Sequence, residues 1–445
     1  MRAPVIPGTR DLLAVHAAHP ARYPFLLQSL AGHPVSGRYD ILFGFPRASL
    51  ELRRGVLKGE GMRPASARFF ESLSAWQREE PRVERAGLPF CGGWFLFLGY
   101  EAARELEPSV SFPESPHGLP DALAVRCPAA LIYDREARAT HLVAEDAALL
   151  PQMEADLLTV PATSAAVPEQ VAEAVEEDAP ESFLGGVRRI HDYLRAGDTF
   201  QVNLSRAWRG KLCVDYLDVY RRLRTANPAP FGGLAHWKGA AVLSSSPERL
   251  VTVDGTRVHT RPIAGTRPRG ADEAEDRNMR ARLLESLKER AEHIMLIDLE
   301  RNDLGRVCTA GSIRVDELMT IESYAHVHHI VSNVSGTLRA GVGAGEVLAA
   351  VFPGGTITGC PKVRAMQIIA ELEGVGRGPY TGSFGYLSLD GRLDTNILIR
   401  SLVCENRRVT LRAGAGIVAD SDPEAELAET RAKARGLLRA LGAVA

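Results

Sequence analysis

Strand-forming runs joined by hairpin turns place the strongest constraint on what this chain can fold into. They recur along most of the 445 residues, and Asp254-Gly255 and Asp390-Gly391 are typical hairpin turns between neighbouring runs. Helical stretches separate groups of strands without a regular alternation of strand and helix. These stretches are residues 182–195, 272–304, 362–373 and 422–441. This order predicts an α+β fold.

Composition divides the chain into three segments. Residues 1–154 mix short strand-like runs with Pro- and Gly-rich turns, whereas residues 155–181 are rich in Ala, Val, Glu and Pro, as surface linkers are. Residues 182–445 hold the longest strand runs and most helices. A chain of this length is too long for one small core, so we expect two lobes or one large domain.

Charge, hydropathy and cysteine spacing exclude several classes of protein. The net charge of -2 is small and mixed, so the molecule as a whole does not attract nucleic acid. The most apolar stretch, residues 92–100, is too short to span a membrane, and the N-terminus has no apolar signal core. The six cysteines lie far apart, which indicates neither a zinc site nor a disulfide framework. We expect a cytoplasmic enzyme with reduced thiols and no membrane or nucleic-acid partner.

Two expected helices carry acidic residues in register. On the first, the acidic positions i, i+4 and i+7 are Glu285, Glu289 and Glu292. The second helix opens with a predicted capping box at Ser421–Glu424, and its next turns hold Glu426, Glu429 and Lys433. Each pattern alone is typical of a solvated helix face. Together, two such helices could supply carboxylates to a shared Mg²⁺, which completes its octahedron with water and substrate oxygens.

Three glycine-bearing segments could cradle an anion, because glycine lets a backbone N–H approach closely. They are residues 262–270, 354–362 and 412–417. In the second, Pro361-Lys362 opens a helix, and a helix N-terminus suits a carboxylate or phosphate. Its spacing is not that of a P-loop, and no dinucleotide-binding fingerprint follows a strand. Glycines of this kind more often form simple turns.

Residues 324–329 hold three histidines. In a strand, His326 and His328 would share one face while His329 points to the other. A metal-binding pair remains open, but no cysteine or acidic partner lies nearby in the sequence. A single catalytic histidine is the favoured interpretation.

Long strings in this order resemble the chorismate-utilising enzymes, which include anthranilate, aminodeoxychorismate, isochorismate and salicylate synthases. The matching strings are QVNLSR, SPERL, RPIAGTRPRG, ERAEHIMLIDLERNDLGRV, FPGGTITGCPKVRAM and AGAGIVADSDPEAE…ET..K, the last of which ends at Lys433. The resemblance implies an anthranilate synthase component I-like fold: two large antiparallel sheets packed face to face, helices outside, and an active-site cleft between the sheets. Residues 1–154 would then contribute to this β-sandwich, and residues 182–445 would form the chorismate-binding catalytic region.

The resemblance also implies roles for individual residues. The expected Mg²⁺ ligands are Glu292 and Glu429, with Glu289 and Glu426 orienting metal-bound water. Glu248 is the expected general acid for the departing C4 hydroxyl, and His329 lies near the leaving side of the ring. The expected binders of the chorismate carboxylates and ring oxygens are Gly265, Thr266, Thr356, Tyr380, Arg400, Gly414 and Lys433.

Gln201 indicates which nucleophile is used. Family members that add water carry a lysine at this position as general base, whereas members that add ammonia carry glutamine, because ammonia already has a lone pair. We therefore expect amination of chorismate. No Cys/His glutaminase region is recognisable, so ammonia should come from a glutamine amidotransferase subunit or from free ammonium.

Short motifs favour one aminating enzyme and a single residue favours the other. QVN, NPAPF and VHH are typical of aminodeoxychorismate synthase, which makes 4-amino-4-deoxychorismate for para-aminobenzoate and folate synthesis. Gln28 and residues 229–232 also differ from a tryptophan feedback site, which predicts no inhibition by tryptophan. Ala264, however, replaces the lysine of some aminodeoxychorismate synthases. The alternative is anthranilate synthase component I, or a relative that stops at 2-amino-2-deoxyisochorismate. The intact catalytic residues disfavour a non-catalytic scaffold.

Overall fold

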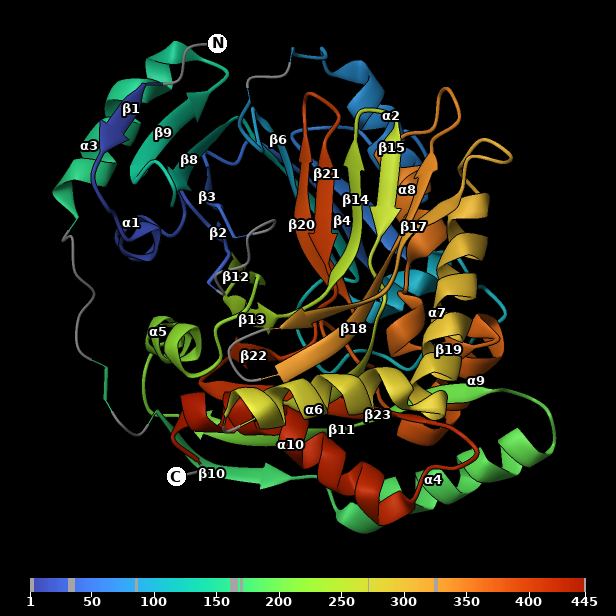
Figure 1. The fold of residues 1–445 in the computed structure, drawn as a ribbon. Helices are drawn as coiled ribbons and strands as arrows, with labels where there is room; N and C mark the ends of the chain where they lie inside the picture. The colour runs from blue at the N-terminus through green and yellow to red at the C-terminus, as the bar shows by residue number, and fades with distance from the viewer. Residues whose placement is uncertain are drawn as a thin grey trace.

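The protein is built on two large antiparallel sheets (Figure 1). The computed structural model describes residues 4–30, 37–84, 87–160, 167–168, 171–270, 272–323 and 327–443. In spatial order, the first sheet holds β1 (Val5–Pro7), β9 (Ala139–Ala144), β8 (Ala129–Asp134), β3 (Tyr39–Gly44), β2 (Phe25–Gln28), β12 (Phe231–Trp237), β13 (Ala240–Ser246), β22 (Ser401–Glu405), β23 (Arg408–Ile417), β11 (Gln201–Leu212) and β10 (Ala172–Glu177), with β19 (Gly359–Cys360) beside β11.

The second sheet mixes N-terminal and C-terminal strands in the same way. Its spatial order is β16 (Ile263–Pro268), β18 (Val327–Thr337), β15 (Arg257–Thr260), β14 (Arg249–Asp254), β21 (Leu393–Asn396), β20 (Ser383–Ser388), β6 (Gly93–Leu98), β7 (Ala122–Cys127), β4 (Ala48–Arg53) and β5 (Val56–Glu60), with β17 (Arg314–Ser323) beside β18. The two sheets and their helices confirm the expected α+β fold.

Phenylalanine rings fill the space between the sheets. Phe25 of the first sheet stacks on Phe95 of the second with ring centroids 4.0 Å apart, and Phe43 and Phe384 lie in the same buried cluster. Strands that are apolar on both faces need cover outside as well, and helices supply it. These helices are α1 (Leu12–Ala18), α2 (Phe69–Glu79), α3 (Leu150–Thr159), α4 (Pro180–Arg195), α5 (Tyr216–Ala226), α8 (Ala344–Val351), α9 (Lys362–Glu373) and α10 (Pro423–Leu441).

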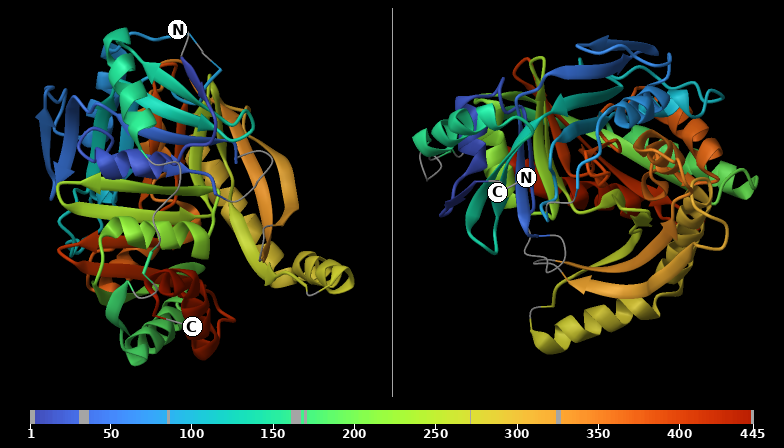
Figure 2. Two further views of the ribbon diagram at one scale, coloured as in Figure 1. Left: turned by 90° about the vertical axis from the view of Figure 1, so that its left-hand side faces the viewer. Right: turned by 90° about the horizontal axis from the view of Figure 1, so that it is seen from above.

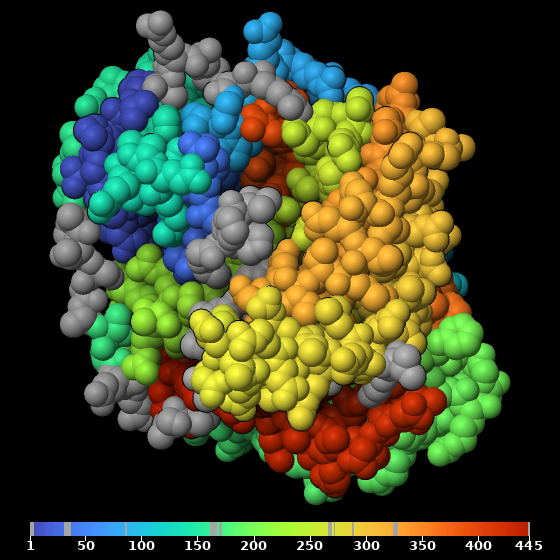
Figure 3. All heavy atoms as spheres, viewed as in Figure 1, coloured from blue at the N-terminus to red at the C-terminus, as the bar shows by residue number. Residues whose placement is uncertain are grey.

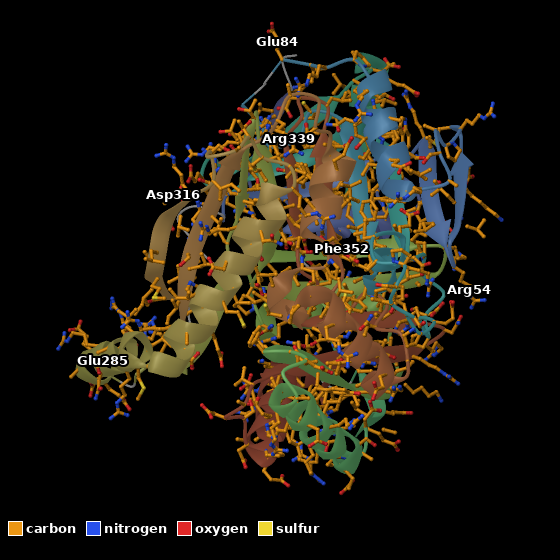
Figure 4. All side chains as sticks on the ribbon, turned by 90° about the vertical axis from the view of Figure 1, so that its right-hand side faces the viewer. Arg54, Glu84, Glu285, Asp316, Arg339 and Phe352 are labelled. Atoms are coloured by element: carbon orange, nitrogen blue, oxygen red, sulfur yellow. The ribbon has the colours of Figure 1, made fainter. Side chains whose placement is uncertain are left out.

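The expected helix over residues 272–304 is in fact two helices, α6 (Glu273–Glu285) and α7 (Leu287–Gly305). Ser286 leaves the helical conformation, and its hydroxyl oxygen accepts a hydrogen bond from Glu289 N at 3.3 Å. A serine that caps a new helix in this way competes with continuation of the old one. The α6 helix extends from the body of the molecule, and Glu285 lies at its far end (Figures 2 and 4). The prediction that Glu285 shares a face with Glu289 and Glu292 is therefore wrong.

The start of α10 also differs from the expected capping box. Asp422, not Ser421, is the N-cap, and its carboxylate accepts from Ala425 N at 2.9 Å. Ser421 instead donates to Glu426 at 2.6 Å. The expected surface-linker segment, residues 155–181, includes the end of α3 and the whole of β10.

Two negative observations hold for the part of the chain that is described. The six cysteines are free thiols. None of the helices combines the length and the apolar character needed to cross a bilayer.

Candidate active site

Several candidate residues lie where the chain crosses from one sheet to the other. Glu248 connects β13 of the first sheet to β14 of the second, and Arg400 connects β21 of the second to β22 of the first. The two crossings are adjacent, because Ser245 N donates to Arg400 O at 3.1 Å and Ile397 N donates to Glu248 O at 3.0 Å. Residues that are 152 positions apart in sequence thus meet where interior strands of the two sheets connect.

Glu248 has the environment of a general acid. Its carboxyl is 6 % exposed and accepts a hydrogen bond from Thr356 Oγ1 at 2.8 Å. Desolvation raises its pKa to about 7, although Thr356, Arg400 and Lys433 act in the opposite direction. A carboxyl group with this pKa holds a substantial proton population at neutral pH. Thr356 belongs to the short 3₁₀ helix η3 (Gly355–Ile357), so the second glycine-bearing segment orients the acid.

Cationic and hydroxyl groups gather beside this acid. Arg400 is surrounded by Tyr380, Glu248 and Glu429, and desolvation lowers the pKa of its guanidinium. Lys433 Nζ donates to Gly414 O at 3.0 Å and pairs with Glu429 at 2.5 Å. The structure therefore brings Tyr380, Arg400, Gly414 and Lys433 together, as expected of groups that bind carboxylates.

His329 lies in the β16–β18 pair of the second sheet. Its Nδ1 is 3.3 Å from Gly265 O, and burial lowers its pKa to about 4, so the imidazole is neutral at pH 7. Gly265 has a φ of +64°, and a Cβ there would lie 2.8 Å from Glu289 Oε2, so Glu289 is adjacent. Thr266 pairs with His329 through the backbone, but its side chain lies outside the described residues, as does His326.

His328 faces away from His329 and has structural contacts. Its ring nitrogens are 2.9 Å from Asp276 and 2.8 Å from Ser323. Lys362, expected near an anion, pairs instead with buried Asp303 at 2.5 Å. His328 is therefore engaged in other contacts than the metal pair considered from the sequence, and Lys362 binds a carboxylate of the protein itself.

The four candidate metal ligands lie on two helices. Glu289 and Glu292 are on α7, whereas Glu426 and Glu429 are on α10 and contact Ser421 and Lys433 respectively. Carboxylate oxygens are the donors that Mg²⁺ prefers, so the chemistry of the set suits this ion. In the described structure, no three His, Cys, Asp or Glu side chains converge closely enough to hold a metal. The Mg²⁺ site stays a prediction.

Arg377, which sequence reasoning missed, ties three of these segments together. Its side chain is 1 % exposed and donates to Ile357 O at 3.0 Å, to Asn203 O at 2.7 Å and to both carboxylate oxygens of Glu373. Arg412 also binds Glu373, at 2.7 Å. Burial opposes ionisation of Glu373, but the two guanidinium groups outweigh it and keep its pKa low. The sequence signal that could have pointed to Arg377 is its position between two glycines, Gly376 and Gly378.

Comparison with known proteins identifies the family. The model of the chorismate binding enzyme family matches residues 47–439. The chain is 41 % identical over 439 residues to anthranilate synthase component 1 of Thermus thermophilus, covering 95 % of this chain and 93 % of that protein. It is 40 % identical to an anthranilate synthase component I-like protein of Synechocystis, covering 92 % and 84 %.

Comparison with solved structures supports the same family assignment. Anthranilate synthase component I from Streptococcus pneumoniae superposes with a TM-score of 0.82 at 33 % identity, covering 91 % of this chain and 93 % of that chain. The menaquinone-specific isochorismate synthase MenF from Escherichia coli, at 19 % identity and a TM-score of 0.75, shares the fold. The chain belongs to the chorismate binding enzyme family.

Proposed function

We propose that this protein is the large subunit of an anthranilate synthase, which converts chorismate and ammonia to anthranilate, pyruvate and water. The observation that carries the proposal is the 41 % identity, across nearly the whole of both chains, to anthranilate synthase component 1 of Thermus thermophilus. Ala264 also supports this proposal, because alanine cannot form the covalent bond that a lysine at this position forms on the way to 4-amino-4-deoxychorismate. The short motifs that favoured aminodeoxychorismate synthase carry less weight than this similarity.

The chemistry begins with bond exchange on the ring. The ammonia lone pair attacks C2, the ring double bonds shift, and the C4–O bond breaks. Hydroxide is a poor leaving group, so protonated Glu248 donates to the departing oxygen, which leaves as water. Thr356 holds the acid in place during this step.

Aromatisation follows when the ring loses its C2 proton and the enolpyruvyl side chain departs. The C3–O bond breaks, and the resulting enolate takes a proton on its methylene carbon to become pyruvate. His329 is suited to take the C2 proton: with Nδ1–H donating to Gly265 O, Nε2 of the neutral ring is the acceptor nitrogen.

Substrate binding uses the cationic groups. Arg400 can pair bidentately with a carboxylate, and Lys433 and the Tyr380 hydroxyl supply further donors. When bound, Mg²⁺ held by Glu292 and Glu429 would supply positive charge to the ring carboxylate. We also propose a separate glutamine amidotransferase subunit as the ammonia source.

The test is to identify the product made by the purified chain from chorismate, Mg²⁺ and ammonium. We expect anthranilate fluorescence and one equivalent of pyruvate without any added enzyme. If 4-aminobenzoate forms, and only after an aminodeoxychorismate lyase is added, the protein is instead an aminodeoxychorismate synthase.

A further inference from the structure

The carboxylate of Asp276 is a junction of hydrogen bonds at the start of α6. Asp276 lies in the first turn of this helix and is 9 % exposed. It accepts from Arg269 Nε at 2.7 Å, from Arg269 Nη2 at 3.1 Å, from Gly270 N at 3.0 Å and from His328 Nε2 at 2.9 Å. Charge-assisted hydrogen bonds to one buried carboxylate fix the donors relative to one another.

These bonds connect three elements of the structure. Arg269 and Gly270 follow directly on β16, at the end of the first glycine-bearing segment, whereas His328 belongs to β18. Figure 3 shows α6, in yellow, at the surface next to the orange strands β17 and β18, with which it is in contact through its first turns. Asp276 therefore fastens both the end of β16 and the start of α6 to β18.

His328 extends the junction to a fourth element. It is fully buried, and its Nδ1 is 2.8 Å from Ser323 Oγ on β17, the residue opposite it in the strand pair. The hydrogen bonds of Arg269 are the largest of the effects that hold the pKa of Asp276 well below its usual range, so this carboxylate is ionised at neutral pH. An ionised carboxylate only accepts, so His328 Nε2 carries the proton and Nδ1 accepts from the Ser323 hydroxyl.

The position of β16 in its sheet explains why such a junction matters. In the described sheet β16 is the last strand and pairs with β18, and its register shifts between Ala264 and Thr266. Gly265, at this irregularity, has a φ of +64° and places its carbonyl oxygen 3.3 Å from His329 Nδ1. Bulges of this kind at a sheet edge re-aim groups near active sites. The place of Gly265 O then depends on what holds the end of β16.

The contact between Gly265 and His329 bears on one step of the proposed reaction. With Nδ1–H donating to Gly265 O, Nε2 of His329 is the nitrogen that takes the C2 proton. If Gly265 O moves, the imidazole loses the partner that fixes its tautomer and orientation. The attack of ammonia on C2 does not use this imidazole, so the second step alone should suffer.

We propose that Asp276 is a positioning residue for the elimination step: by fastening β16 to His328 of β18, it keeps Gly265 O in place as the partner of His329. The inference rests on the proposed function, in which the C2 proton leaves after ammonia has been added. When His329 is misplaced, the C2–H and C3–O bonds stay intact. The aminated ring is then released with its enolpyruvyl group still attached, as 2-amino-2-deoxyisochorismate.

The test follows chorismate consumption and anthranilate fluorescence in one reaction, at saturating ammonium and Mg²⁺. Asp276→Ala should consume chorismate within about twofold of the wild-type rate, while anthranilate formed per chorismate falls about tenfold or more, because a small misplacement can cost about 10²-fold in the step concerned. Mass spectrometry should find the remainder as the aminated ring that retains its enolpyruvyl group, and wild-type protein should convert this material to anthranilate and pyruvate.

A matched control removes a different carboxylate from the same pair of strands. Asp316 of β17 accepts from Asn333 Nδ2 at 2.5 Å and from Ser335 Oγ at 2.8 Å, both on β18. Asp316→Ala therefore loses a comparable set of cross-strand hydrogen bonds but leaves the end of β16 fastened. It should form one anthranilate per chorismate, as the wild type does.

Two further variants separate positioning from folding. His328→Leu breaks the bonds to Asp276 and Ser323, should release the same intermediate, and carries the same test if Asp276→Ala does not fold. Asp276→Asn keeps an acceptor for Gly270 N, and its amide can donate to His328 Nε2 in the other tautomer, so it should form mainly anthranilate.

Three results would overturn the role of Asp276. They are an equal fall of chorismate consumption and anthranilate formation in either folded variant, Asp276→Ala or His328→Leu, an undiminished anthranilate yield in either of them, or as much intermediate from Asp276→Asn as from Asp276→Ala. Wild-type protein that forms no anthranilate from chorismate and ammonium instead overturns the proposed function.

Discussion

At the scale of single residues, Glu248 combines burial, one hydrogen bond and two nearby cations. Burial is the largest of these effects on its pKa, which lies at about 7. We expect Glu248→Gln to lower kcat by about 10²- to 10⁴-fold, because a positioned proton donor is lost. In the wild type, kcat should fall as pH rises through about 7, since the acid form is then depleted. Stopped assays across pH 5.5–9 check both points, roughly spanning this pKa; unchanged turnover in the variant would exclude the role.

Glu429 offers a second residue-scale prediction. If it is a metal ligand, Glu429→Gln should remove most activity and raise the Mg²⁺ concentration needed for half-maximal rate, while the nearly isosteric side chain preserves the fold. Glu424→Gln, an exposed position in the first turn of the same helix, is the control. Mg²⁺ titrations of the three proteins decide the question; near-normal turnover of Glu429→Gln at limiting Mg²⁺ would show that the metal assignment is wrong.

Several residues that sequence reasoning found lie within contiguous motifs. Glu248, Thr356 and Lys433 each lie in a matching string, whereas Tyr380 and Arg400 lie outside these strings. Glu373 and Arg377 are four positions apart, but Arg412 comes from a distant strand, and only folding shows that the three side chains pair in the interior.

At the scale of elements, turn chemistry was the most reliable guide. Asp254-Gly255 and Asp390-Gly391 do join the paired strands β14–β15 and β20–β21. Residues 272–304 were misjudged because their composition is helical throughout, and the single serine that ends one helix and caps the next has an ordinary helix propensity. Local propensity sets the type of element, but its ends depend on a few hydrogen bonds.

The Arg377 cluster leads to an element-scale prediction. It joins the end of α9, the η3 turn and β11, so Arg377→Met should lower the free energy of unfolding by about 3 kcal/mol by leaving a buried carboxylate short of one partner. Arg301→Met, which removes an exposed pair with Asp298, should cost less than about 1 kcal/mol. Denaturant unfolding gives both values; equal small losses would mean that the buried cluster contributes no more than a surface pair.

At the scale of the whole molecule, the source of nitrogen is the first question. The isolated chain should form product with ammonium but not with glutamine, because no glutaminase region is recognisable in the sequence. Adding a matching amidotransferase should restore glutamine-dependent activity. Assays of pure chain with each nitrogen donor check this, and glutamine-dependent turnover by the chain alone would contradict a two-subunit enzyme.

Regulation is the second whole-molecule question. Gln28, at the position where the sequence departs from a feedback site, is buried, donates to Asp40 at 3.1 Å and accepts from Tyr220 at 3.1 Å. Its amide is therefore committed to the protein's own groups. We expect millimolar tryptophan to leave the rate of product formation unchanged at sub-saturating chorismate; competitive inhibition would show that a feedback site persists.

The interleaving of early and late strands in both sheets has a consequence for biosynthesis. Trp94 of β6 pairs with Leu387 of β20, and Leu26 of β2 pairs with Leu234 of β12. At about 10 residues per second, the ribosome releases β6 roughly half a minute before β20 exists. During that time one edge of β6 lacks its native neighbour β20, although β7 pairs with the other edge, and unpaired strand edges invite self-association. A nascent chain of this kind should depend on holding chaperones until its last third emerges, and slower elongation should lower its yield.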